Sequence, residues 1–95
     1  MDKVEFKQIA DFLNDVYEGL CEGDEEAAIR LHLTELYRVI KRLMDATFET
    51  KNQDLKVLLA SLEYRARQYK QQIEEWLAVR NRVHRPPHGF LSAFP

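Results

Sequence analysis

The chain has 95 residues, of which 45% are hydrophobic and 32% charged, with a net charge of −2. This length suits one ordinary domain, and this composition is typical of folded helical proteins rather than disordered ones. A single cysteine, Cys21, excludes an internal disulfide. No apolar run approaches the roughly 20 residues of a membrane span, and the first residues lack the pattern of a secretory signal. We therefore expect one cytoplasmic domain without a membrane segment.

An apolar stripe predicts a first helix from about residue 3 to residue 20. Its members recur at intervals of three and four residues: Phe6, Ile9, Leu13, Val16 and Leu20. Gly23 follows, a residue type that commonly ends helices because it lacks a Cβ. Asp24 is a candidate N-cap for the next helix. The Gly23-Asp24 pair therefore predicts a turn.

A second helix is predicted from about residue 25 to residue 50, on a seam with heptad-like spacing. The seam consists of Ile29, Leu33, Leu36, Ile40 and Leu43, widened on one side by Tyr37 and Met44. The apolar pattern lapses around residues 49–53. Asn52 can adopt a left-handed conformation there, and Asp54 can cap the following helix, so we expect a turn.

The third predicted helix is the longest, from residue 54 or 55 to residue 83. Its apolar side consists of Leu55, Leu58, Leu59, Leu62, Ala66, Tyr69, Ile73, Trp76 and Val83. Pro86 and Pro87 must end it, because proline lacks the amide donor that a helix needs. At 1.5 Å per residue this helix is about 43 Å long and the first about 27 Å. We therefore expect Ile73, Trp76 and Val83 to find too little first-helix surface to pack against.

These elements predict an all-α fold: a three-helix antiparallel, up-down-up bundle with a long third helix and an extended C-terminal tail. Residues 1–85 form the bundle, and residues 86–95 form a proline-rich apolar tail. The residues central to the stripes are predicted to form the core: Leu36, Ile40, Leu58, Leu62 and Ile73. Replacing a buried leucine such as Leu62 with alanine is expected to cost about 2–5 kcal/mol.

The charges are divided unevenly along the chain. Residues 1–50 hold 6 Lys and Arg against 12 Asp and Glu, whereas residues 51–95 hold 8 against 4. The two parts thus carry −6 and +4. Since neighbouring helices of a bundle bring these parts side by side, we expect electrostatic attraction between them. Part of the electrostatic field remains available to attract a partner.

The polar residues give few signs of chemistry. Arg80 and His84 stand one helical turn apart, and such a pair can hold a phosphate and move a proton. An unrecognised small helical enzyme that uses these two residues is therefore one alternative. A basic last turn is expected anyway, because cations complement the helix dipole there. His32, His84 and His88 include no pair on one helix at a metal-ligand spacing. We therefore expect no catalytic residue, no metal site and no cofactor.

Nucleic-acid binding is a second alternative. The third predicted helix interleaves basic residues with aromatic ones: Arg65, Arg67, Lys70, Arg80, Arg82 and Arg85 with Tyr64, Tyr69 and Trp76. The aromatic residues also fit the apolar stripe, and acidic residues dilute the basic ones. The pI near 5.9 is below that of most small nucleic-acid binders. We therefore favour core packing for these rings.

By elimination, a non-enzymatic protein–protein interaction module is the leading hypothesis. Small helical bundles of this kind serve as inhibitors, immunity proteins, chaperones and assembly subunits. We expect a homodimer or a tight complex with another protein. The predicted contact residues lie at the end of the third helix and in the tail: Trp76, Arg80, Val83, Phe90, Leu91 and Phe94.

Overall fold

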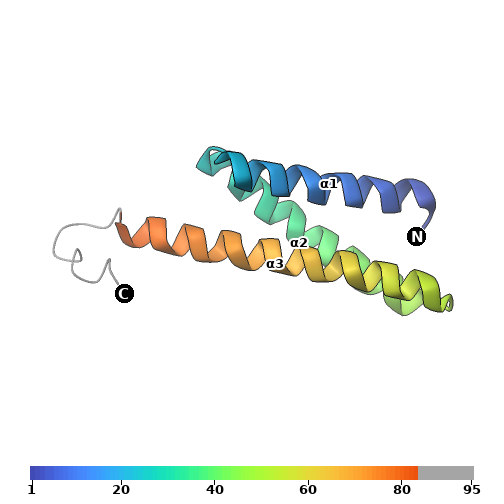
Figure 1. Cartoon of the computed structure of the whole chain (residues 1–95). Helices are drawn as coiled ribbons and strands as arrows, with labels where there is room; N and C mark the ends of the chain where they lie inside the picture. The colour runs from blue at the N-terminus through green and yellow to red at the C-terminus, as the bar shows by residue number, and fades with distance from the viewer. Residues whose placement is uncertain (84–95) are drawn as a thin grey trace.

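The computed structural model describes residues 1–83, with side-chain surroundings through residue 81. It contains α1 (Lys3–Glu22), α2 (Glu26–Glu49) and α3 (Gln53–Val83) (Figure 1). Short turns connect them, so the predicted antiparallel three-helix bundle with a long third helix is confirmed. None of these three helices is apolar enough over a sufficient length to cross a membrane.

The turn between α1 and α2 begins at Gly23, as predicted. Its φ of 76° lies in the left-handed region, and the amide of Asp24 donates to the Gly19 carbonyl at 2.9 Å. The prediction of Asp24 as an N-cap is wrong, because Glu25 precedes the first turn of α2 without a side-chain cap. The Asp24 carboxylate instead lies 3.6 Å from Nε2 of His32.

The turn between α2 and α3 is organised by Asn52 in a way that the sequence did not predict. No non-glycine residue among those described has a positive φ, so Asn52 is not left-handed. Its Oδ1 accepts a hydrogen bond from the amide of Leu55 at 3.1 Å. Asn52 is therefore the residue that caps α3, and the assignment of this role to Asp54 is wrong.

The core lies between the three helices, with the closest backbone approach between α2 and α3 and with α1 packed across both (Figure 1). All three helices contribute buried apolar side chains: Ile9, Leu13 and Val16 from α1, Ile29, Leu36, Ile40, Leu43 and Ala46 from α2, and Leu59, Leu62, Ala66, Ile73 and Leu77 from α3. Four of the five predicted core residues are confirmed. The prediction for Leu58 is wrong, because this side chain is 53% exposed whereas Leu59 is fully buried.

The far half of α3 is better covered than the helix lengths suggested. Ile73 is fully buried, and Trp76 is half-buried against the core. One turn before Ile73, the ring of Tyr69 lies 6.2 Å from the ring of Tyr17 in α1. The expected shortage of packing surface is therefore wrong for Ile73, because α1 and the first turns of α2 reach this part of α3.

Polar contacts attach α1 to both other helices. Arg42 of α2 donates two hydrogen bonds to Glu5, at 2.7 and 2.9 Å, and Arg65 of α3 donates to Asn14 at 3.0 Å. The hydrogen bond from Arg42 holds the pKa of Glu5 below its ordinary value. Direct attraction between the acidic and basic parts of the chain is limited, because within the described residues Glu26–Arg80 is the ion pair that joins them.

Candidate interaction surface

Trp76 and Arg80, two of the predicted contact residues, stack on each other near the end of α3. The guanidinium carbon of Arg80 lies 4.6 Å from the centroid of the indole ring. An arginine over an aromatic face is held by a cation–π interaction and also shields the ring from water. Arg80 thus covers part of Trp76 instead of leaving the ring bare.

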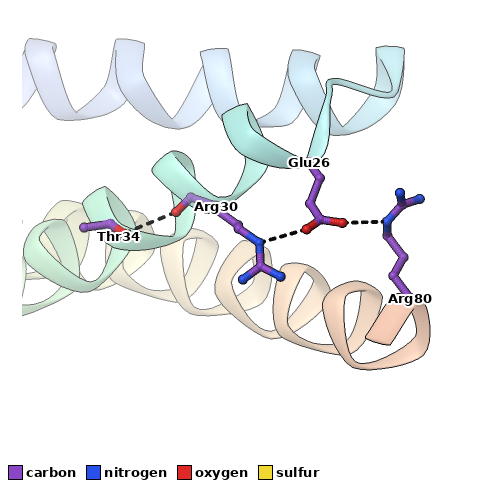
Figure 2. A network of polar contacts seen from close by, with 4 residues as sticks. All are labelled: Glu26, Arg30, Thr34 and Arg80. Atoms are coloured by element: carbon purple, nitrogen blue, oxygen red, sulfur yellow. Dashed lines mark hydrogen bonds and ion pairs between the residues drawn. The ribbon is translucent and has the colours of Figure 1, made fainter. Parts of the chain in front are cut away.

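The same arginine takes part in a polar network that joins α3 to the start of α2 (Figure 2). Glu26 accepts a hydrogen bond from Nε of Arg30 and another from Nε of Arg80, both at 3.0 Å. The Thr34 hydroxyl donates to the Arg30 carbonyl at 3.2 Å. The hydrogen bond from Arg30 and, to a smaller extent, the one from Arg80 hold the pKa of Glu26 below its ordinary value. Arg80 therefore positions the two helix ends, and its guanidinium already has a counter-ion.

A pocket of about 220 Å³ lies beside Trp76, where all three helices meet. Its lining is mostly apolar and comprises Leu20, Gly23, Ile29, Gln72 and Trp76. Gly19 is close by, and a Cβ at this position would collide with the side chain of Asp24. A glycine at position 19 therefore leaves room for the Asp24 side chain beside α1.

The remaining predicted contact residues are not placed by the structure. Val83 ends α3, and its side-chain surroundings are not described. Phe90, Leu91 and Phe94 lie outside the described residues, as does His84. The structure therefore brings together Trp76 and Arg80, and the role of the tail stays a prediction.

A second pocket, of about 380 Å³, opens at the opposite end of the bundle. Its apolar walls are Met1, Phe6, Leu55 and Leu58. Its other lining residues are polar and lie near the starts of α1 and α3. Leu58 is exposed because it lines this open pocket beside the start of α1. The pocket thus explains why one leucine of the Leu58-Leu59 pair is not buried.

Several exposed apolar side chains form a surface on the side of the α2–α3 hairpin that faces away from α1. It comprises Tyr37, Met44 and Phe48 of α2 and Tyr64 of α3, and we call it the hairpin face. Phe48 is 91% exposed, and each of the other three is roughly half exposed or more. Nη2 of Arg67 lies 3.2 Å from Sδ of Met44, which ties the two helices together on this side.

Sequence reasoning overlooked Phe48, although a signal was present. Tyr37, Met44 and Phe48 are spaced by seven and four residues, which places them on one side of a helix next to the buried seam. The sequence pattern predicts that Tyr37 and Met44 widen the core. In the structure, Tyr37 and Met44 lie at the edge of the core and are about half exposed, whereas Phe48 on the same side of α2 is almost fully exposed.

Three basic residues in the middle of α3 are engaged within the chain. Arg65 contacts Asn14 and Tyr69, Arg67 pairs with Glu63 at 2.8 Å, and Lys70 pairs with Glu74 at 3.3 Å. A phosphate backbone would have to compete with these partners. These contacts weigh against a nucleic-acid interface on this helix.

The described residues contain no group of three or more His, Cys, Asp or Glu that could hold a metal ion. Comparisons with known proteins give no relative: no family model matches the chain, and no curated protein and no solved structure is significantly similar to it. The physical properties of its surfaces are therefore the basis for assigning a function.

Proposed function

We propose that the protein is a non-enzymatic helical interaction module that binds another protein or a second copy of itself through helix faces and its C-terminal segment. The observation that carries this proposal is the hairpin face. Phe48 is 91% exposed and stands one turn after Met44 on α2, and exposed apolar residues that group together mark interaction sites. Aromatic residues and methionine are enriched in protein interfaces.

The end of α3 provides a second contact region in this proposal. Trp76 presents one side to the pocket that Leu20 and Ile29 also line, while Arg80 covers part of its ring. Tryptophan and arginine are the residue types that most often dominate binding energy in interfaces. We include Val83, Phe90, Leu91 and Phe94 in this region on the basis of their sequence.

Site-specific photo-crosslinking in cells tests the proposal. A photoreactive phenylalanine analogue replaces Phe48 in one variant and the exposed α1 residue Gln8 in a control. We expect discrete protein adducts from position 48 and none of the same mass from position 8. An adduct of twice the chain mass identifies self-association. Absence of protein adducts at position 48, or adducts to nucleic acid instead, contradicts the proposal.

Truncation tests the second region. Removal of residues 86–95 is expected to weaken association or to expose dye-binding apolar surface, while circular dichroism still reports the three helices. A truncated protein that remains equally stable and binds its partner unchanged removes the tail from the proposed surface.

A further inference from the structure

The pocket beside Trp76 is apolar and has the size of a single ring. Its volume is about 220 Å³, and its apolar lining comes from Leu20, Gly23, Ile29 and Trp76. For comparison, an apolar cavity of about 150 Å³ is large enough to hold benzene. Because Ile73 is fully buried and Trp76 is half-buried, the space that remains beside the indole ring can be filled by one side chain.

The C-terminal segment supplies side chains of the right kind. Twelve residues of the chain follow Val83, which ends α3, and they include Phe90, Leu91 and Phe94. Water favours the contact of such apolar side chains with another apolar surface. The pocket therefore has a chemically matched segment that begins at the end of the same helix.

The position at which α3 ends favours a return of the chain to the pocket. Trp76 and Val83 are seven residues apart, which is nearly two helical turns, so the two backbone positions lie on the same side of α3. The helix also extends past the turn between α1 and α2 (Figure 1). The chain thus leaves α3 beyond the pocket and on the side where Trp76 stands.

The length of the connection allows Phe90 to reach the pocket. On α3 the pocket is lined by Gln72 and Trp76, which lie about 10–16 Å before Val83 along the helix axis. Six residues separate Val83 from Phe90, and they span up to about 20 Å when they are extended. Phe90 can therefore return to this level of the helix even if part of the connection is used to reverse the chain.

The sequence of the connection also favours a reversal. It contains Pro86-Pro87 and Gly89, which are residue types that mark turns. Phe94 follows Phe90 by four residues, or about 13 Å of extended chain, and would pass beyond the pocket. Phe90 is therefore the aromatic residue whose spacing fits.

From this arrangement we infer that the Phe90 ring occupies the pocket beside Trp76 within the same chain. Gln72 contributes a polar side chain to the lining, and its amide can hydrogen-bond the backbone of the returning segment. Arg80 covers one part of the indole ring, and Phe90 covers the part that borders the pocket. The inference goes beyond the proposed function, because it gives the C-terminal segment a place in the free protein.

Intrinsic fluorescence tests the inference in the full chain, because Trp76 is its only tryptophan. Phe90→Ser is expected to shift the Trp76 emission to longer wavelength and to speed its quenching by acrylamide, because water then reaches the indole ring. Phe94→Ser removes the same side chain from a neighbouring position, so it is the matched control and should leave both properties close to native. Circular dichroism verifies that each variant keeps its helices.

A peptide added in trans measures the same contact. Removal of residues 86–95 leaves the buried core of the three helices in place and should give the emission of Phe90→Ser. A synthetic peptide of residues 86–95 should reverse this shift, whereas the same peptide with Phe90→Ser should not. The native peptide should bind with a Kd below about 1 mM, because a segment attached by a short linker has an effective concentration in the millimolar range.

Several results would overturn the inference. They are unchanged Trp76 emission in Phe90→Ser, a larger shift in Phe94→Ser than in Phe90→Ser, and no effect of the native peptide on the truncated protein. A native emission that shifts over about a hundredfold dilution assigns the ring to a second copy, because docking within one chain does not depend on concentration. If position 48 crosslinks to a protein in cells while Phe90→Ser leaves the emission unchanged, the proposed function stands and this inference fails.

Discussion

Leu58 and Leu59 are adjacent in the sequence, yet their replacement by alanine should have very different effects on stability. Leu59 is fully buried, and burial of a leucine side chain contributes about 1.5–3 kcal/mol. Because neighbouring helices cannot fully close the resulting cavity, Leu59→Ala should cost about 2–5 kcal/mol. Leu58 is 53% exposed and borders an open pocket, so about half of the transfer energy and no cavity energy applies. Leu58→Ala should therefore cost about 1 kcal/mol.

Urea denaturation followed by circular dichroism at 222 nm measures both effects. A domain of this size loses about 1 kcal/mol of stability per molar urea, so Leu59→Ala should lower the unfolding midpoint by about 2 M or more. Leu58→Ala provides the control, because it has the same chemistry at the adjacent position. Leu62→Ala should behave like Leu59→Ala. Similar losses for Leu58 and Leu59, or a larger loss at Leu58, would refute the placement of α3 against the other helices.

Three further substitutions and conditions test local features. Gly23→Ala should cost about 1–2 kcal/mol in the same urea assay, because a φ of 76° strains a residue with a Cβ. Gly23→Asn should lose less stability. Equal stability of the native protein and both variants would contradict the left-handed turn. Asn52→Ala should cost about 1 kcal/mol through loss of the α3 cap, and Asp54→Ala should cost less if Asn52 is the capping residue. Because the pKa values of Glu5 and Glu26 are lowered by folding, their contribution to stability is present above their unfolded pKa and is lost as pH falls through the folded value. The urea midpoint should therefore decrease below about pH 4.5, and a variant with glutamine at both positions should show a shallower decrease.

The sequence alone predicted the number, order and approximate bounds of the helices. Helical periodicity and the residues that end helices depend on local sequence, so they can be recognised without knowledge of the fold. Gly23 is the clearest example, because its left-handed φ follows from a property of the residue itself. Asn52 and Asp54 show the limit of such reasoning: both are good caps, and the hydrogen bond to the Leu55 amide identifies Asn52.

Tertiary structure decided which side of each helix is covered. Leu58 and Leu59 are 100° apart on α3 and both fit its apolar stripe, so only the positions of the other two helices determine which one is buried. In the same way, Trp76 and Arg80 were correctly placed near the end of α3, but Arg80 is bound to Glu26, 54 residues away in the sequence. The exposure of Phe48 likewise depends on α1 packing on the opposite side of the hairpin. A sequence specifies the direction of each side chain relative to its own helix, whereas burial depends on neighbours that only the folded chain brings near.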